Sequence, residues 1–129
     1  VKIDFINSID TNILKNIEGS TDTEYCFGLF LTYIKKIKDP IKTMIKLFNF
    51  IKKFKLKSYL NFVVSNNNFL IASRIILNDK INPAISLYYN KERKIISSEP
   101  LDKESDEWKV VPKNNLVYIN KNNFKILKF

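Results

Sequence analysis

The chain has 129 residues, of which 22 are Lys or Arg and 13 are Asp or Glu, so its formal net charge is +9. It has no histidine and one cysteine, Cys26, which excludes Ser-His-Asp and Cys-His catalysis, histidine zinc sites and an internal disulfide. A reducing, cytoplasmic setting is therefore the default, and no apolar run approaches the roughly 18 residues of a membrane span.

Helices are expected first along the chain. Apolar residues recur at helical spacing over residues 4–17, and Gly19 is expected to end that element. Thr21 and Glu24 have the spacing of a capping box, which predicts the start of a second helix that continues to Ile37. Asp39-Pro40 predicts the start of a third helix, with Asp39 as its N-cap. We expect one face of this helix to pack against a sheet, and its lysines to face solvent.

Strand patterns take over after residue 58. Strands are predicted over residues 59–65, 69–76, 85–89, 94–98, 116–119 and 124–127, with a polar loop over 102–107. Asn-rich turns at residues 66–68 and 120–123 suit hairpins, because Asn tolerates positive φ. No Gly-, Ser- or Pro-rich linker divides the chain, so we expect one α+β domain over residues 1–129, with helices first and antiparallel strands after them.

The positive charge has two interpretations. It predicts a polyanionic partner, either nucleic acid or an anionic membrane. Alternatively, it reflects a bias toward the A/T-rich codons that Lys, Asn and Ile share. Arg occurs only as Arg74 and Arg93, although base recognition favours Arg, so the second interpretation is preferred and nucleic acid is not the expected partner.

Asp22 is the first candidate for a binding residue. It follows Thr21 in the first turn of the predicted second helix, where the unpaired backbone N–H groups favour a negative charge. A carboxylate in that position can receive a ligand's ammonium group. The competing interpretation is that Thr21, Asp22 and Glu24 only cap the helix.

Six segments resemble, in order, those of the class-II glutamine amidotransferases, which use an N-terminal nucleophile. They are STDTEYCFGLFL at residues 20–31, LNFVVS at 60–65, IASR at 71–74, SLYY at 86–89, SSEPL at 97–101, and the stretch from Trp108 through VP to LVYI at 116–119. The SLYY and SEPL pair is most similar to the branch that includes glutathione-degrading amidotransferase subunits.

The resemblance implies an αββα four-layer sandwich and hydrolysis of a γ-glutamyl amide bond, in glutamine or in a γ-glutamyl peptide such as glutathione. It implies that Asp22 holds the substrate's α-amino group, that no cofactor or metal is needed, and that a partner peptidase or synthase subunit is possible. Thr21, Arg74, Ser98 and Glu99 are weaker candidates for substrate binding. Arg74 is a candidate because its planar fork suits paired acceptors, and Ser98 and Glu99 are candidates because they lie at a strand end.

The departures from the family concern catalysis. The family's nucleophile is an N-terminal Cys whose own amine is the base. Val1 has no thiol or hydroxyl, and Cys26 is expected to be a small buried residue inside a helix. The family's carboxylate-binding Arg and its Asn-Gly oxyanion hole have no counterparts here. We therefore expect that this chain is the downstream part of the domain and that it is inactive on its own. The alternative is a non-catalytic, degenerate domain that binds a partner subunit or an anionic surface.

Overall fold

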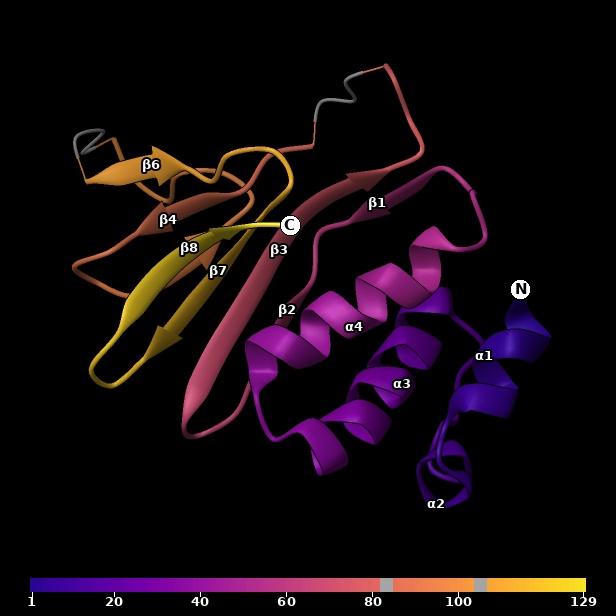
Figure 1. Ribbon diagram of the computed structural model, residues 1–129. Helices are drawn as coiled ribbons and strands as arrows, with labels where there is room; N and C mark the ends of the chain where they lie inside the picture. Colours follow the sequence, from indigo (N-terminus) through magenta and orange to yellow (C-terminus); the bar gives the residue numbers. More distant parts are fainter. Residues whose placement is uncertain (82–84, 104–106) are drawn as a thin grey trace. The chain divides into compact units, whose positions relative to one another are not determined.

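The computed structural model describes residues 1–81, 85–103 and 107–129, and the chain forms two compact units, Val1–Lys55 and Leu56–Phe129. The first unit contains helices only and the second contains antiparallel strands only (Figure 1). The α+β class, with helices preceding strands, is confirmed. Each unit is described in turn.

Four helices form the N-terminal unit: α1 (Lys2–Ser8), α2 (Thr11–Leu14), α3 (Asp22–Ile37) and α4 (Pro40–Lys52). Helix α3 contacts each of the other three helices. The aromatic rings of Phe5, Phe50 and Phe54 join α1 to the end of α4, with 5.1 Å between the centroids of Phe5 and Phe50. These ring contacts join the first helix of this unit to the last.

The single helix predicted over residues 4–17 is wrong, because the chain breaks between α1 and α2. Ile9 is extended, with φ −86° and ψ 137°. The Asp10 side chain caps α2 by accepting a hydrogen bond from Asn12 N, and the Asp10 backbone N donates to Thr32 Oγ1 on α3 at 2.9 Å. The backbone N–H of Asp10 thus bonds to a side chain of α3 and not to a carbonyl of α1. Gly19 also does not end this element, since α2 already ends at Leu14.

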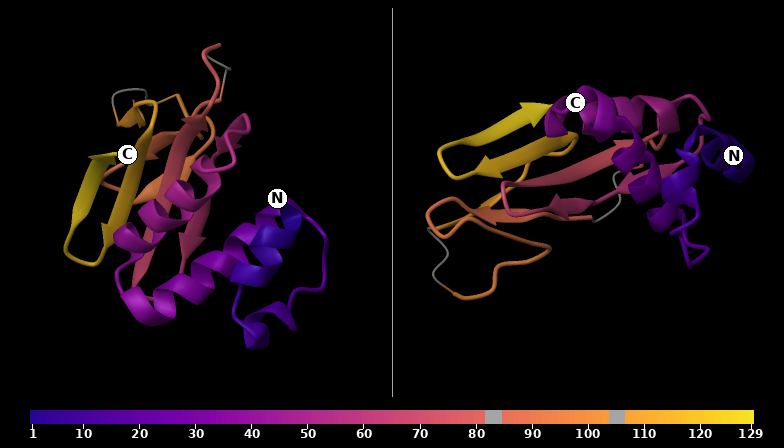
Figure 2. Two further views of the ribbon diagram at one scale, coloured as in Figure 1. Left: turned by 45° about the vertical axis from the view of Figure 1, so that its right-hand side comes forward. Right: turned by 90° about the horizontal axis from the view of Figure 1, so that it is seen from below.

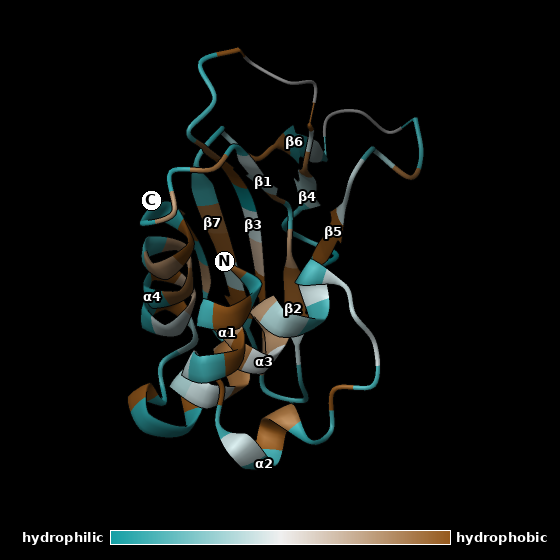
Figure 3. Ribbon diagram, turned by 90° about the vertical axis from the view of Figure 1, so that its right-hand side faces the viewer, coloured by the Kyte–Doolittle hydropathy of each residue, from teal (hydrophilic) through white to brown (hydrophobic). Residues whose placement is uncertain are grey.

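The predicted starts of α3 and α4 are confirmed. Thr21 is the N-cap of α3 in a complete capping box, and the Asp39 side chain accepts hydrogen bonds from Ile41 N and Lys42 N at the start of α4. Lys38 separates the helices in a left-handed conformation, φ 59°. Helix α4 alternates hydrophobic and hydrophilic residues along its length (Figure 3), and it buries Met44, Leu47 and Phe48 while Lys42 and Lys46 are exposed.

Two antiparallel sheets form the C-terminal unit. In the larger sheet, β3 (Phe69–Leu77) pairs with β7 (Asn115–Asn120), and β7 pairs with β8 (Phe124–Lys128). Strands β1 (Ser58–Leu60) and β2 (Val63–Ser65) both lie along the other side of β3. In the smaller sheet, β4 (Tyr88–Asn90) lies between β5 (Ile95–Ser97) and β6 (Trp108–Val110). Figure 2 (right) shows orange strands of this sheet on a different level from the yellow strand β8 of the larger sheet.

The strand predicted over residues 59–65 is interrupted by a serine hydroxyl. Ser73 Oγ accepts a hydrogen bond from Phe62 N at 3.0 Å and donates one to Leu60 O at 2.8 Å. The Ser73 hydroxyl accepts the bond from Phe62 N that a backbone carbonyl of β3 would accept in a regular strand pair. Regular pairing therefore stops between β1 and β2. The register is the same on both sides, with Leu60 opposite Ile75 and Val63 opposite Ala72.

The other strand predictions hold with changes at their ends. The strand expected over residues 85–89 is wrong at its start, because regular pairing begins only at Tyr88. The strand expected over residues 94–98 is shorter and runs from Ile95 to Ser97. Residues 104–106 of the predicted loop lie outside the described part, and strand β6, which begins at Trp108, was not predicted.

Both predicted Asn-rich turns form, and in each an Asn side chain accepts hydrogen bonds from two backbone N–H groups. Asn66 Oδ1 accepts hydrogen bonds from Asn68 N and Phe69 N, and Asn120 Oδ1 accepts them from Asn122 N and Asn123 N. The expected positive φ is not found at either turn. The Asn side chain acts here as an acceptor for the turn's free amides.

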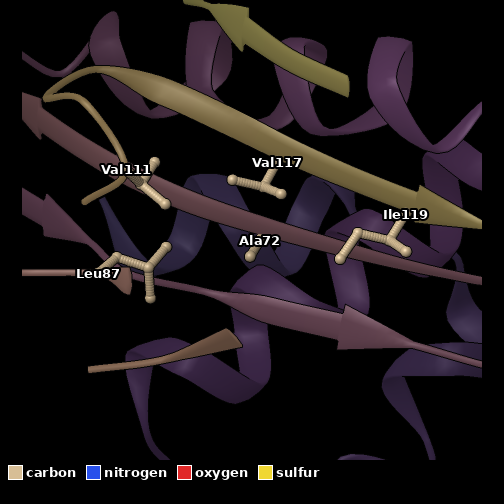
Figure 4. Close-up of a cluster of buried hydrophobic side chains, with 5 residues drawn as sticks. All are labelled: Ala72, Leu87, Val111, Val117 and Ile119. Carbon is tan, nitrogen blue, oxygen red and sulfur yellow. The ribbon is translucent and has the colours of Figure 1, made fainter. Parts of the chain in front are cut away.

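A hydrophobic cluster lies between the two sheets of the C-terminal unit. Ala72 on β3 and Val117 and Ile119 on β7 gather with Leu87 and Val111, which flank the smaller sheet (Figure 4). All five are at most 4% exposed. Leu87 and Val111 are therefore held in the core of this unit, and both lie next to residues of the site below.

Candidate functional site

Thr21 and Glu24 carry out the capping of α3 between them. Glu24 N donates to Thr21 Oγ1 at 3.3 Å, and Glu24 Oε2 accepts from Thr21 N at 3.3 Å and from Thr21 Oγ1 at 3.1 Å. The second Glu24 oxygen accepts from Gly19 N at 3.1 Å. Both Glu24 oxygens are thus engaged, and the Thr21 hydroxyl is used for the helix.

Asp22 is left out of this network. It is the first residue of α3 and is exposed, and its carboxylate makes no hydrogen bond or ion pair with any residue that the structure describes. The positive end of the helix dipole stabilises a negative charge at this position. Asp22 therefore has the charge and the free acceptor atoms that an ammonium ligand needs, and the interpretation that it caps the helix does not apply to its side chain.

Cys26 lies one helical turn after Asp22 and is buried, with 7% of its surface exposed. Burial, and to a smaller extent the negative charge of Asp22, raises the pKa of its thiol to about 12. A thiol in this state supplies almost no thiolate near neutral pH, so it is a poor nucleophile. The prediction that Cys26 is a small buried residue is confirmed.

The guanidinium group of Arg74 donates hydrogen bonds to two backbone carbonyls of the protein. Its Nε donates to Ile85 O at 3.0 Å and its Nη1 donates to Val111 O at 2.7 Å. It therefore ties β3 to the segments that lead into β4 and out of β6. The sequence predicted that Arg74 binds substrate, whereas the acceptors found here are two backbone carbonyls of the same unit.

Ser98 and Glu99 follow the last residue of β5 and are both exposed. The Ser98 carbonyl accepts a hydrogen bond from Ser86 Oγ at 2.8 Å. The side chains of Ser98 and Glu99 make no hydrogen bond or ion pair within residues 1–81, 85–103 and 107–129, so both present free polar atoms.

The structure thus places the predicted residues in two groups. Thr21 and Asp22 lie together in the N-terminal unit. Arg74 and Ser98 are joined in the C-terminal unit through the segment 85–86, to which each is hydrogen-bonded. Asn61 belongs to the same group, because its Nδ2 donates to Ser86 O at 3.1 Å.

The sequence did not single out Asn61 and Ser86, which the structure connects to each other and to Ser98 by hydrogen bonds. Their signal was present, since both are polar residues inside short strand-like segments, LNFVVS and SLYY, where a buried strand would be expected to carry apolar residues. In the part of the chain that the structure describes, no group of three or more His, Cys, Asp or Glu side chains could hold a metal ion. No helix there is long and apolar enough to cross a membrane.

Comparisons with known proteins bear on this arrangement. No family model matches the chain. A curated relative, the probable glutamine amidotransferase DUG3 of Saccharomyces cerevisiae, is 27% identical over 165 aligned positions that cover 94% of this chain and 46% of the relative. Over nearly its whole length the chain is thus similar in sequence to a probable glutamine amidotransferase. The family resemblance predicted from the six segments is therefore confirmed.

The fold of the chain agrees with that of a solved structure. A protein of Silicibacter pomeroyi, described as a glutamine aminotransferase class-II domain protein, superposes with a TM-score of 0.81 at 20% sequence identity. The match covers 99% of this chain and 60% of that protein. The chain thus spans about half the length of the curated protein and three fifths of the solved one.

Proposed function

We propose that this chain is the substrate-holding part of an amidotransferase that hydrolyses a γ-glutamyl amide bond, with the nucleophile supplied by residues outside the sequence given. The observation that carries the proposal is the free carboxylate of Asp22 at the start of α3, beside a capping box that leaves it unused. The relationship to glutamine amidotransferases supports it.

In this mechanism Asp22 binds the α-ammonium group of the glutamyl substrate. Charge-assisted hydrogen bonds of this kind contribute roughly 1.5–3 kcal/mol, and they fix the substrate's orientation before attack. The nucleophile is an N-terminal Cys whose own amine takes up its proton, as in class-II enzymes with an N-terminal nucleophile. Cys26 takes no part, because a thiol with a pKa of about 12 is protonated at neutral pH.

The substrate is glutamine or a γ-glutamyl peptide such as glutathione, and the proposed setting is the cytoplasm. A partner peptidase or synthase subunit would use the products. The whole chain, residues 1–129, is then one part of a class-II amidotransferase domain, inactive without the nucleophile. Thr21, Arg74, Ser98 and Glu99 remain weaker candidates for substrate contacts.

The test uses the complete gene product and measures the release of glutamate from glutamine and from glutathione. Asp22→Asn should raise KM about 10- to 150-fold, which corresponds to roughly 1.5–3 kcal/mol, and should change kcat less. Glu18→Gln, which removes a nearby exposed carboxylate, is the matched control and should leave KM unchanged. If Asp22→Asn leaves KM unchanged, Asp22 does not hold the substrate.

The second candidate is a non-catalytic domain that binds an anionic surface. It is favoured by the exposed lysines of α4, Lys42 and Lys46, and by the net charge of +9. Binding to RNA and to anionic vesicles, titrated with salt, distinguishes the two candidates. A surface of this kind should bind near physiological salt and release its partner as salt rises, because binding releases counterions.

A further inference from the structure

Two neighbouring residues at the start of α3 are able to cap this helix, and the structure uses the weaker of them. Thr21 is the N-cap, with φ −79° and ψ 149°, and Asp22 follows it as the first helical residue. Asp is in general a better N-cap than Thr, because its carboxylate readily accepts hydrogen bonds from the free backbone N–H groups of the first turn. A second start is therefore open to α3, one residue later, with Asp22 as its N-cap.

Two other helices of the N-terminal unit show that Asp caps closely in this chain. Asp10 Oδ1 accepts a hydrogen bond from Asn12 N at 2.8 Å at the start of α2. Asp39 Oδ1 accepts one from Ile41 N at 2.9 Å at the start of α4. In both helices the carboxylate is used up by the helix, which is what the later start of α3 would do to Asp22.

The bonds that Thr21 itself makes to the first turn of α3 are long. The Thr21 hydroxyl accepts from Glu24 N at 3.3 Å, and the Thr21 carbonyl accepts from Tyr25 N at 3.4 Å. Backbone N–H groups in proteins most often bond to oxygen at about 2.9–3.0 Å. The contacts of Thr21 alone therefore do not explain why Thr21 caps the helix and Asp22 does not.

Glu24 favours the earlier start. Its carboxylate accepts hydrogen bonds from Gly19 N, Thr21 N and Thr21 Oγ1 at 3.1–3.3 Å. A capping box needs a Glu or Gln at the third helical position, which Glu24 occupies only when Thr21 is the cap. If the helix began one residue later, that position would fall to Tyr25, which has no carboxylate. The reciprocal half of the box would then be lost.

We propose that Glu24 is a positioning residue that fixes the start of α3 at Thr21 and so keeps the Asp22 carboxylate out of the helix cap. As an N-cap, Asp22 would bond to the backbone N–H of residue 24 or 25, and an ammonium ligand would have to displace that bond. This deepens the proposed function, because the ligand is the α-ammonium group of the γ-glutamyl substrate. Glu24 does not touch the substrate and acts only through the position at which the helix begins.

The first measurement follows the helix start without any substrate. The Cα chemical shift of Asp22, read by NMR in the complete gene product, distinguishes a helical residue from an extended one. Glu24→Ala should move this shift from its helical value toward the extended value, because an N-cap residue is not helical. Glu24→Gln should keep Asp22 helical, since Gln also completes a capping box. A helical Asp22 in Glu24→Ala would overturn the proposal.

The second measurement is the release of glutamate by the same variants. Glu24→Ala should raise KM for the γ-glutamyl substrate roughly three- to tenfold with kcat nearly unchanged, because the substrate must first displace an N-cap bond. Glu24→Gln should restore KM. Asp39→Ala is the matched control, since it removes the two N-cap bonds of α4 in the same unit. It should lower stability but change neither the Asp22 shift nor KM.

The outcomes separate this inference from the proposed function. If Asp22 becomes extended in Glu24→Ala but KM does not change, Glu24 is not a positioning residue and the inference is overturned. It is also overturned if Glu24→Gln raises KM while Asp22 stays helical, because the charge of Glu24 would then act on the substrate itself. The proposed function survives both results as long as Asp22→Asn raises KM. No hydrolysis by the unmodified protein overturns the proposed function and the positioning role together.

Discussion

Gly19→Ala tests whether the capping box depends on the glycine that precedes it. A Cβ at Gly19 would lie 1.8 Å from Glu24 Oε2, which is far inside van der Waals contact, so the Glu24 carboxylate must move. It would then lose its bonds to Gly19 N, Thr21 N and Thr21 Oγ1. The φ of Gly19 is not positive, so alanine is otherwise compatible with the backbone.

Two opposing terms set the magnitude. Loss of the capping contacts costs about 1–2 kcal/mol of unfolding free energy. Replacing Gly by Ala in a compatible conformation stabilises the folded chain by about 0.4–1 kcal/mol, because the unfolded chain loses freedom. The net expectation for Gly19→Ala is destabilisation by about 1 kcal/mol.

The sign should reverse when Glu24 is absent. In a Glu24→Ala background the contact no longer exists, and Gly19→Ala should stabilise the protein by about 0.4–1 kcal/mol. The assay is urea unfolding of the complete gene product followed by far-ultraviolet circular dichroism, for both single variants and the double variant. A coupling energy of about 1–2 kcal/mol is expected. Additive effects, within about 0.3–0.5 kcal/mol, would refute this explanation of Gly19.

Three further predictions concern buried or paired groups. Cys26 should react with iodoacetamide at pH 8 only after denaturation, because its pKa is about 12; rapid alkylation of the native protein would contradict this. Thr43→Val should raise the unfolding free energy by about 1 kcal/mol, since the buried Thr43 hydroxyl has no hydrogen-bond partner within the described residues; a fall would mean that the hydroxyl is satisfied. The pKa of Asp79 is lowered chiefly by the hydrogen bond from the Tyr59 hydroxyl. Desolvation, the next largest effect, opposes this, while Ile81 N and the charges of Lys57 and Lys113 lower the pKa further. Its contribution to stability is therefore present above about pH 3.9 and is lost as the pH falls through its folded-state pKa, so Asp79→Asn should weaken the acid dependence of stability. An unchanged acid limb in titrations of both proteins would argue against this assignment.

Features that depend on neighbouring residues were predictable from the sequence. The capping box of Thr21 and Glu24, and the Asp39-Pro40 start of α4, use bonds that span at most three residues. The Asn turns also form within four residues, although the side chain and not a positive φ supplies the turn. Residue type and spacing are sufficient wherever both partners of a bond lie in one turn.

Breaks in the elements were not predictable, because their causes lie elsewhere in the chain. The end of α1 at Ser8 accompanies a bond from Asp10 N to Thr32, 22 residues away. The gap between β1 and β2 comes from the Ser73 hydroxyl, which bonds to Leu60 and Phe62 across the sheet. Neither partner could be chosen from a local pattern.

The same distinction between local and distant contacts applies to the candidate site. The sequence alone determined that Asp22 stands at the start of a helix beside a capping box, since that arrangement needs only residues 21–24. The tertiary structure decided that no described residue from elsewhere in the chain pairs with the Asp22 carboxylate, and that burial suppresses the reactivity of Cys26. It also decided that Arg74 binds carbonyls 11 and 37 residues away, because only folding brings those acceptors within reach of one guanidinium.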